Sequence, residues 1–224
     1  MHTPPAAPPP RRDEERRAAL RAGIALALCA GMLTALVATE WRPLVDTDAR
    51  VARTTHRWAT DAPGLTHAVR ILTDWVWDPW TMRLLAALAA VWLVRRYAAW
   101  LTAVWLVGTC ALAVLAEQGV KAAVGRPRPV WPDPVDSAHY AAYPSGHAMT
   151  ATVVCGLLLW LVHRYGAGRR VRRTAAAVAV VSVVGVGATR VWLGVHWLSD
   201  VVGGWLLGAL VVALAVAVRP RRRD

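Results

Sequence analysis

Hydrophobic residues along this chain fall into long runs that contain almost no charge, and arginines gather between the runs. A run of about 20 apolar residues is long enough to cross the hydrocarbon core of a bilayer, roughly 30 Å thick, as a helix. Because several runs approach that length, the pattern predicts an all-α, polytopic membrane protein built as a six-transmembrane-helix bundle. The predicted spans are 23–39, a run from near Trp77 to Val94, 98–120, 148–162, 174–189 and 200–218.

The segment between the first two spans, residues 40–80, has a mixed pattern. Charged residues such as Arg53 interleave with apolar residues such as Val51 at a roughly helical spacing. This spacing predicts a short amphipathic helical segment on or near the membrane surface. Its two histidines, His56 and His67, are expected at the surface or the interface rather than as ligands.

The two ends of the chain are polar. Residues 1–22 combine five prolines with a run of charged residues, a composition typical of a disordered tail. Residues 219–224 form a short basic tail. The predicted organisation is therefore one transmembrane domain over residues 23–218 between two cytoplasmic tails.

Composition and charge agree with this layout. Of the 224 residues, 56% are hydrophobic, and the formal net charge is +12. The arginines cluster at the ends of apolar runs and not on one face of a folded module, which argues against binding to nucleic acid. Six spans would put both termini and the arginine-rich segment 164–173 on the same side, and an excess of Lys and Arg marks the cytoplasmic side. The localisation expected is the cell membrane, with both termini in the cytoplasm.

A proline-rich loop runs into the fourth apolar run through Pro144, Ser145, Gly146 and His147. Pro144 fits the first turn of a helix, and Ser145 is a good capping residue. A helix start presents free N–H groups and the positive end of the helix dipole, which suit an anion. His147 can exchange a proton near neutral pH. Such a turn is also an ordinary helix cap, so its meaning depends on the stretches on either side.

Two further polar stretches, residues 121–129 and 189–200, fall at the same outer ends of the predicted spans. Each supplies fixed positive charge, which can neutralise a phosphate group and the charge on its oxygens. Guanidinium groups also match phosphate oxygens in pairs. Taken singly, such cations could simply mark the interfacial ends of helices. The phosphate-binding candidates are Lys121, Arg128, Ser145, Gly146 and Arg190.

His196 and Asp200 are four residues apart, so on a helix they would share a face. A carboxylate there can bind one ring nitrogen of His196, fix its tautomer and leave the other nitrogen free to attack. His147 is then the candidate general acid for the leaving oxygen. The same spacing fits a structural pair or a metal site, but the surrounding cations would repel a metal ion, so neither a metal nor a cofactor is expected. Glu117 and Arg126 are accessory candidates.

Together the three stretches resemble the signature of the type 2 phosphatidic acid phosphatase superfamily. That signature reads Lys-x₆-Arg-Pro, then Pro-Ser-Gly-His, then Ser-Arg-x₅-His-x₃-Asp, and this chain departs from it only in Thr189, which keeps the hydroxyl. The resemblance implies six transmembrane helices, a phosphohistidine intermediate on His196, His147 as the acid and no metal. It also implies lipid phosphate or diphosphate substrates. Soluble vanadium haloperoxidases share these residues, but six hydrophobic runs argue against that reading.

The leading hypothesis is therefore a membrane phosphatase that hydrolyses a lipid phosphate or diphosphate at the extracytoplasmic face. The motifs bind phosphate without reading the lipid, so undecaprenyl diphosphate, phosphatidic acid and phosphatidylglycerol phosphate are all candidates. One alternative is a lipid phosphotransferase, in which an alcohol accepts the phosphoryl group. Another is a lipid-binding or lipid-transporting membrane protein without catalysis.

Overall fold

The computed structural model describes residues 12–219, and within them the fold is entirely helical, without a strand. Proline stands at the start of α2, α3 and α4, where its missing N–H leaves no helical hydrogen bond unmade. The all-α class is therefore confirmed. The helices are α1 (Arg12–Ala38), α2 (Arg42–Asp61), α3 (Pro63–Ile71), α4 (Pro79–Tyr97), α5 (Trp100–Val124), α6 (Gly146–Arg164), α7 (Arg169–Trp192) and α8 (Leu198–Val218), with a short π-helix over Leu72–Val76.

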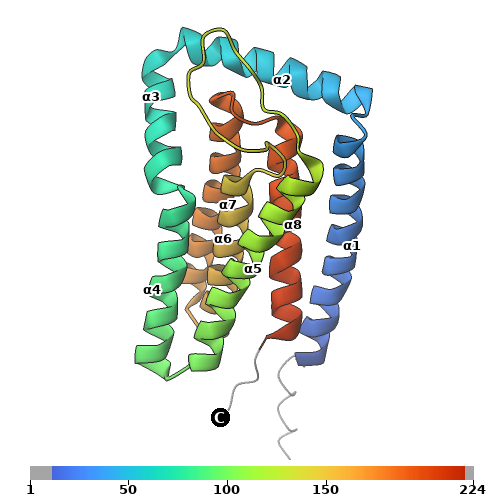
Figure 1. The fold of residues 1–224 in the computed structure, drawn as a ribbon. Helices are drawn as coiled ribbons and strands as arrows, with labels where there is room; N and C mark the ends of the chain where they lie inside the picture. The colour runs from blue at the N-terminus through green and yellow to red at the C-terminus, as the bar shows by residue number, and fades with distance from the viewer. Residues whose placement is uncertain (1–11, 220–224) are drawn as a thin grey trace, which may run out of the picture.

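Helices α1 and α4 to α8 run along the long axis of the molecule, and α2 lies across one end of them (Figure 1). The loop over residues 125–145, between α5 and α6, lies at this α2 end. The start of α1 and the end of α8 lie together at the opposite end, where Arg219 forms an ion pair with Glu15. The two described ends of the chain are therefore on the same side of the bundle.

The core of the bundle is built around α6. Its buried residues Met149, Val153 and Leu157 recur every four positions and pack against apolar residues of α4, α5 and α8. Close approach of α8 to α6 depends on small residues, since a Cβ at Gly208 would meet Thr152 and the backbone of α6. This packing brings the N-terminal ends of α6 and α8 together.

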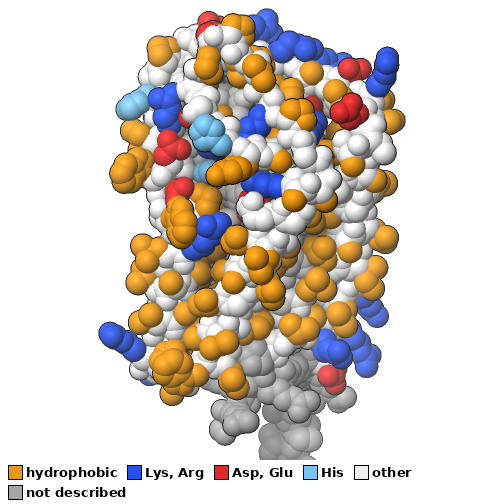
Figure 2. All heavy atoms as spheres, in the orientation of Figure 1, with side chains coloured by type: hydrophobic (Ala, Val, Ile, Leu, Met, Phe, Trp, Pro, Cys, Tyr) orange, Lys and Arg blue, Asp and Glu red, His pale blue; other side chains and the backbone are white. Residues whose placement is uncertain are grey.

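Within residues 12–219, the helices long and apolar enough to cross a membrane are α1, α5, α6, α7 and α8. Helix α4 has 19 residues, as α6 does, but it carries Arg83, Arg95 and Arg96 and is not among them. On the face shown in Figure 2, charged side chains lie in the upper part and at the lower edge, and the band between is hydrophobic or uncharged. The count of six spans stays a prediction that depends on α4.

The helical part of the chain begins earlier than predicted. Helix α1 starts at Arg12, so residues 12–22 of the segment predicted as a disordered tail are helical. Three acidic residues, Asp13 to Glu15, occupy the first turn, where negative charge is favoured by the helix dipole. The predictions for residues 1–11 and 220–224 fall outside the described residues.

The segment over residues 40–80 forms α2, α3 and the π-helix. Helix α2 turns one face inward, with Asp48, Ala52 and His56 buried at intervals of four. The surface position predicted for His56 is wrong: the side chain is buried and its ring stacks on Trp131, with ring centroids 4.0 Å apart. His67 is exposed, as expected. The location of this segment at the membrane surface stays a prediction.

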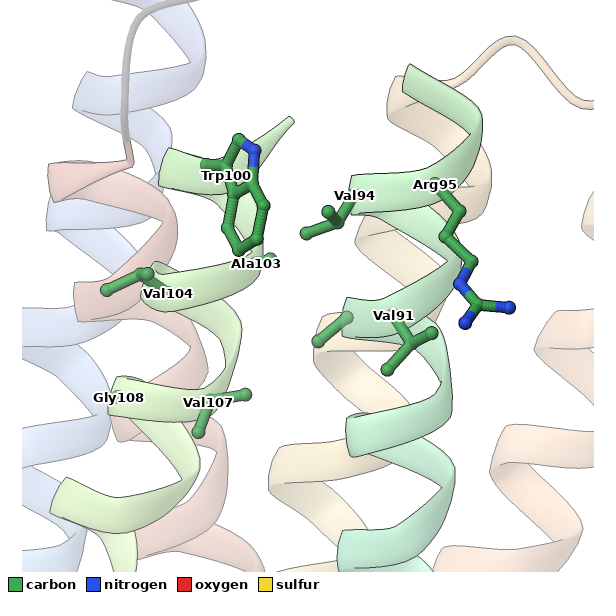
Figure 3. A pocket seen from close by; sticks show the side chains of 9 residues that line it. Val91, Val94, Arg95, Trp100, Ala103, Val104, Val107 and Gly108 are labelled. Carbon is green, nitrogen blue, oxygen red and sulfur yellow. The ribbon is translucent and has the colours of Figure 1, made fainter. Parts of the chain in front are cut away.

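An apolar groove of about 550 Å³ lies between α4 and α5 near the turn that joins them (Figure 3). Val91 and Val94 line it from α4, and Trp100 and Val104 from α5. The groove lies where α5 begins, whereas Lys121 lies in the last turn of that helix. It is therefore remote from the polar residues at the α2 end of the bundle.

Candidate active site

The turn before α6 carries the Ser-Gly-His sequence. Ser145 is the N-cap of α6, Gly146 its first residue and His147 its second. The predicted capping hydrogen bond does not form. The Ser145 hydroxyl is buried and has no hydrogen-bond partner in the described part of the chain. Pro144 precedes the cap, so its predicted place in the first turn is also wrong. The hydroxyl and the first N–H groups of α6 are left available to an anion.

This turn is held between α5 and α8. A Cβ at Gly146 would collide with the Glu117 carboxylate, which places α5 directly against the turn. On the other side, the Ser145 N–H donates to the Asp200 carbonyl over 2.9 Å. A Cβ at Gly204 would meet the Ser145 carbonyl oxygen, so the glycine allows this approach. Backbone contacts thus join the second polar stretch to the third.

His196 lies just before α8, and Asp200 reaches back to it from the first turn of that helix. The spacing predicted that the two residues would share a helix face, and this is wrong because His196 lies outside the helix. Their contact forms all the same: His196 Nδ1 is 3.3 Å from Asp200 Oδ2, and His196 Nε2 is 3.0 Å from Arg128 Nη1. A guanidinium only donates hydrogen bonds, so Nε2 is unprotonated and the proton is on Nδ1. The nitrogen beside Arg128 carries the lone pair.

Asp200 is fully buried, and Arg126 holds its carboxylate. Arg126 Nη1 is 2.6 Å from Asp200 Oδ1, and Arg126 Nη2 is 2.8 Å from Asp48 Oδ2 of α2. Asp48 also accepts hydrogen bonds from the N–H and the hydroxyl of Ser199, in the first turn of α8. One guanidinium thus bridges two buried carboxylates, which gives the accessory candidate Arg126 a specific position.

Asp48 and Ser199 belong to the candidate site and were not predicted from the sequence. Asp48 is 1% exposed, although it lies among exposed charges. A buried carboxylate needs a cation or hydrogen-bond donors beside it, so an acidic residue on the buried face of a helix indicates such a partner. Asp48 falls four residues before Ala52, on the apolar side of α2, and an acid on the apolar side of a helix was the available signal.

The two other cations have carboxylate partners at the margin of the site. Lys121 Nζ is 2.8 Å from Glu117 Oε1, one turn earlier on α5. Arg190 is buried in the last turn of α7, with Nη1 3.9 Å from Asp136 Oδ2 in the α5–α6 loop. Its Nε is buried without a hydrogen-bond partner among the described residues. Both cations therefore retain N–H donors for an incoming anion.

The pKa of His196 reflects its burial and three cations of the polar stretches. Burial, and then the charges of Arg128, Arg190 and Lys121, hold the pKa of His196 well below its ordinary value. Of these three cations, Arg128 contacts the ring directly, through its Nη1. His147 is half-buried and within electrostatic reach of the same three cations and of His196. Residues from all three polar stretches thus meet at the α2 end of the bundle, and the role of each stays a prediction.

The donor set fits an anion with several oxygens. Across residues 12–219, no group of three or more His, Cys, Asp or Glu side chains is placed to hold a metal ion. The gathered groups are instead guanidinium, ammonium, hydroxyl and backbone N–H groups, which together match the oxygens of a phosphate.

Comparison with known proteins identifies related chains. A family model of the PAP2 superfamily matches residues 102–224, which include all three polar stretches. The decaprenylphosphoryl-5-phosphoribose phosphatase of Mycobacterium tuberculosis (strain H37Rv) is 34% identical over 161 residues, 70% of this chain and 78% of that protein. The phosphatidylglycerophosphatase B of Bacillus subtilis is 34% identical over 101 residues, 45% of this chain, and the match spans only 49% of that protein's length.

A solved structure shares the fold. The crystal structure of a transmembrane PAP2 type phosphatidylglycerolphosphate phosphatase from Bacillus subtilis superposes with a TM-score of 0.77 over 86% of this chain and 93% of that chain, at 23% identity. The chain has several helices that are long and apolar enough to cross a membrane, and it shares its fold with a transmembrane protein. It is therefore a multi-pass membrane protein.

Proposed function

This chain belongs to the PAP2 superfamily, and on that premise we propose that it is an integral membrane phosphatase that hydrolyses a lipid phosphate or diphosphate. The observation that carries the proposal is the setting of His196, with Nδ1 on Asp200 and an unprotonated Nε2 beside Arg128. A nucleophile held in one tautomer next to a fixed cation suits attack on a phosphorus atom. Both curated relatives described above are phosphatases by name.

In the first step of the proposed mechanism, Nε2 of His196 attacks phosphorus, and the N–P bond forms as the P–O bond to the lipid breaks. Arg128, Lys121 and Arg190 neutralise the charge that spreads over the phosphoryl oxygens. Asp200 keeps its hydrogen bond to Nδ1 and stabilises the positive ring. His147 gives its proton to the leaving oxygen of the lipid.

In the second step, water attacks the phosphorus atom of the phosphohistidine and the N–P bond breaks. His147, now without its proton, takes one from the water, and inorganic phosphate leaves. The unpartnered Ser145 hydroxyl and the N–H of Gly146 can hold the phosphoryl oxygens through both steps. No metal and no cofactor takes part in this scheme.

The substrate is proposed as a class, because the gathered groups recognise phosphate and not the lipid. Undecaprenyl diphosphate, phosphatidic acid and phosphatidylglycerol phosphate remain candidates. The Mycobacterium relative adds a fourth, a phosphoribose linked to a polyprenyl phosphate.

The proposed location of the site is the extracytoplasmic face. The site lies at the α2 end of the bundle, and the end of α4 with Arg95 and Arg96, the start of α7 with its arginines and the described termini lie at the other end. The positive-inside rule assigns that second end, and with it both termini, to the cytoplasm.

The test is phosphate release by the purified full-length protein over a panel of lipid monophosphates and diphosphates, with and without EDTA. We expect release from at least one lipid, unaffected by EDTA, and none from a His196→Ala variant. Absence of release from the whole panel would favour a lipid-binding or lipid-transporting protein. Loss of release in EDTA, restored by a divalent ion, would contradict the metal-free scheme.

A further inference from the structure

A second basic site lies on α2, apart from the candidate active site. A cavity of about 540 Å³, here called the α2 pocket, is lined by Arg50, Arg53, Thr54, His56, Arg57 and Trp131. Its volume lies within the range of pockets that hold small ligands, roughly 300–1,000 Å³. None of the lining residues belongs to the catalytic or phosphate-binding set proposed above.

The wall of the α2 pocket is positively charged. Its three arginines are exposed and lie three and four residues apart, so they project from one side of α2. Along residues 12–219, no ion pair joins any of them to a carboxylate, and Arg50 donates to the Thr47 hydroxyl over 3.2 Å. Like charges one turn apart, as in Arg53 and Arg57, destabilise a helix. An anion between these guanidinium groups would remove that repulsion.

The floor of the α2 pocket is formed by packed aromatic rings, and one of its buried polar atoms lacks a hydrogen-bond partner. His56 stacks on Trp131 with an interplanar angle of 9°, and Trp131 Nε1 donates to the Gly194 carbonyl over 2.9 Å. His56 Nε2 is 3.1 Å from Asp133 Oδ1, so one carboxylate offsets part of the positive charge. His56 Nδ1 is buried and has no hydrogen-bond partner in the described part of the chain. Such an atom carries a desolvation cost that a ligand can relieve.

We propose that the α2 pocket binds a phosphate-bearing anion. Arg53 and Arg57 would donate paired N–H groups to its oxygens, as guanidinium groups do in phosphate recognition. His56 would supply a further polar contact at the floor. Two sources share this chemistry, the headgroup of an anionic phospholipid and free inorganic phosphate. Helix α2 lies across the end of the bundle (Figure 1), where the headgroups of the outer leaflet would lie if the long helices cross the bilayer.

The test compares three forms of the full-length protein. In Arg53→Gln/Arg57→Gln, two guanidinium groups of the α2 pocket are removed. In Arg170→Gln/Arg172→Gln, the matched control, the same charge is removed from exposed positions at the start of α7, at the other end of the bundle. All four positions are exposed, and equal melting temperatures would show that the fold is kept. Native mass spectrometry then measures retained phosphatidylglycerol against phosphatidylcholine, and calorimetry measures binding of inorganic phosphate.

If a lipid headgroup is the ligand, the preference for phosphatidylglycerol falls roughly tenfold or more in the α2 variant and is kept in the α7 variant. If free phosphate is the ligand, lipid retention is equal in all three forms, and the α2 variant loses one phosphate site that the wild type has. Unchanged binding of both probes by the α2 variant, or equal losses in the two variants, overturns the proposal. Neither measurement depends on turnover, so the result is independent of the proposed phosphatase activity.

Discussion

Asp48, Arg126, Asp200 and His196 form a continuous line of contacts from α2 to the candidate nucleophile. The distances along it are 2.8 Å, 2.6 Å and 3.3 Å. Both carboxylates are buried, and they share the single charge of Arg126. Removing one charged member of such a set leaves a buried charge without its full compensation. If Asp48 lost its charge, Arg126 would bind Asp200 alone and reduce the support that Asp200 gives to a positive imidazole.

Asp48 is expected to affect catalysis through its contact with Arg126. Asp48→Asn should lower kcat by about 10–100-fold, the effect typical of a residue that orients an active-site group, with little change in KM. The matched control is Asp46→Asn, which removes an exposed carboxylate from the same helix and should leave kcat unchanged. Steady-state kinetics on one lipid phosphate measures both. A normal kcat for Asp48→Asn would show that its contacts serve only the fold.

The two histidines are expected to respond differently to substitution. His196→Ala should abolish turnover of every substrate, because no phosphohistidine can form. His147→Ala should cost ~10²–10⁴-fold on a lipid monoester, and less on p-nitrophenyl phosphate, whose leaving group needs little protonation. Turnover of both variants on both substrates is the measurement. Equal losses for His147→Ala on the two substrates would argue against its role as the acid, and phosphate trapped on His147 would reverse the assignment.

The pH dependence follows from the setting of His196. Burial, with Arg128, Arg190 and Lys121, holds the pKa of His196 well below its ordinary value, which is about 6.5. Attack needs the unprotonated ring, so kcat/KM should be retained as the pH falls to about 6.5 and be lost only below it. Arg128→Gln removes the cation that lowers the pKa of His196 most, so it should raise that pKa and move the acid limb to higher pH. Using one substrate for both proteins cancels the ionisation of the substrate, and superimposable acid limbs would contradict the argument.

At the scale of the elements, the site depends on how α8 packs against the start of α6. A Cβ at Gly204 would stand 2.6 Å from the Ser145 carbonyl oxygen and 3.0 Å from the Ala148 Cβ. Backbone at that position cannot move aside as the end of a long side chain can. The small residue in α8 therefore sets the distance between the Ser-Gly-His turn and the His196–Asp200 pair.

Gly204→Ala should accordingly destabilise the protein by about 1–3 kcal/mol, the usual cost of overpacking, and should lower activity because the two helix starts separate. The control is Gly119→Ala in α5, where nothing lies within 4 Å of an added Cβ. Thermal unfolding in one detergent, with turnover at a temperature where both variants are folded, gives the comparison. Equal melting temperatures and activities for the two variants would contradict this account of the packing.

At the scale of the whole molecule, the arrangement of the helices separates the chain into two ends. The α2 end holds the candidate active site and the α5–α6 loop, and the other end holds the described termini and the loop between α6 and α7. If the long helices cross the bilayer, these two ends face opposite sides of the membrane.

This arrangement predicts a labelling pattern in intact cells. The three native cysteines, Cys29, Cys110 and Cys155, would first be replaced. A single cysteine at exposed Ser137, in the α5–α6 loop, should react with a membrane-impermeant thiol reagent, and one at exposed Gly168, between α6 and α7, only after permeabilisation. The inverse pattern would place the candidate active site in the cytoplasm and contradict the extracytoplasmic proposal.

The sequence by itself determined the apolar helices, the proline-rich loop and the three polar stretches. Apolar runs, the prolines around residues 127–134 and the spacing of Lys121, Arg128, Arg190 and His196 are local features, and they depend on no distant contact. The predicted spans fall within or close to α1 and α4 to α8. Helices α1 and α7 begin at arginines before their apolar runs, because arginine is also a good helix former.

Only the tertiary structure decided which side chains meet. Asp48 and Ser199 are 151 residues apart, and His56 and Asp133 are 77 apart, so no local pattern shows that they touch. The Ser145 hydroxyl remains without a bond because the surrounding helices, not the local turn, determine its neighbours. Burial is a property of the packed bundle, and it makes Asp48 a partner of the site and His56 the floor of a pocket.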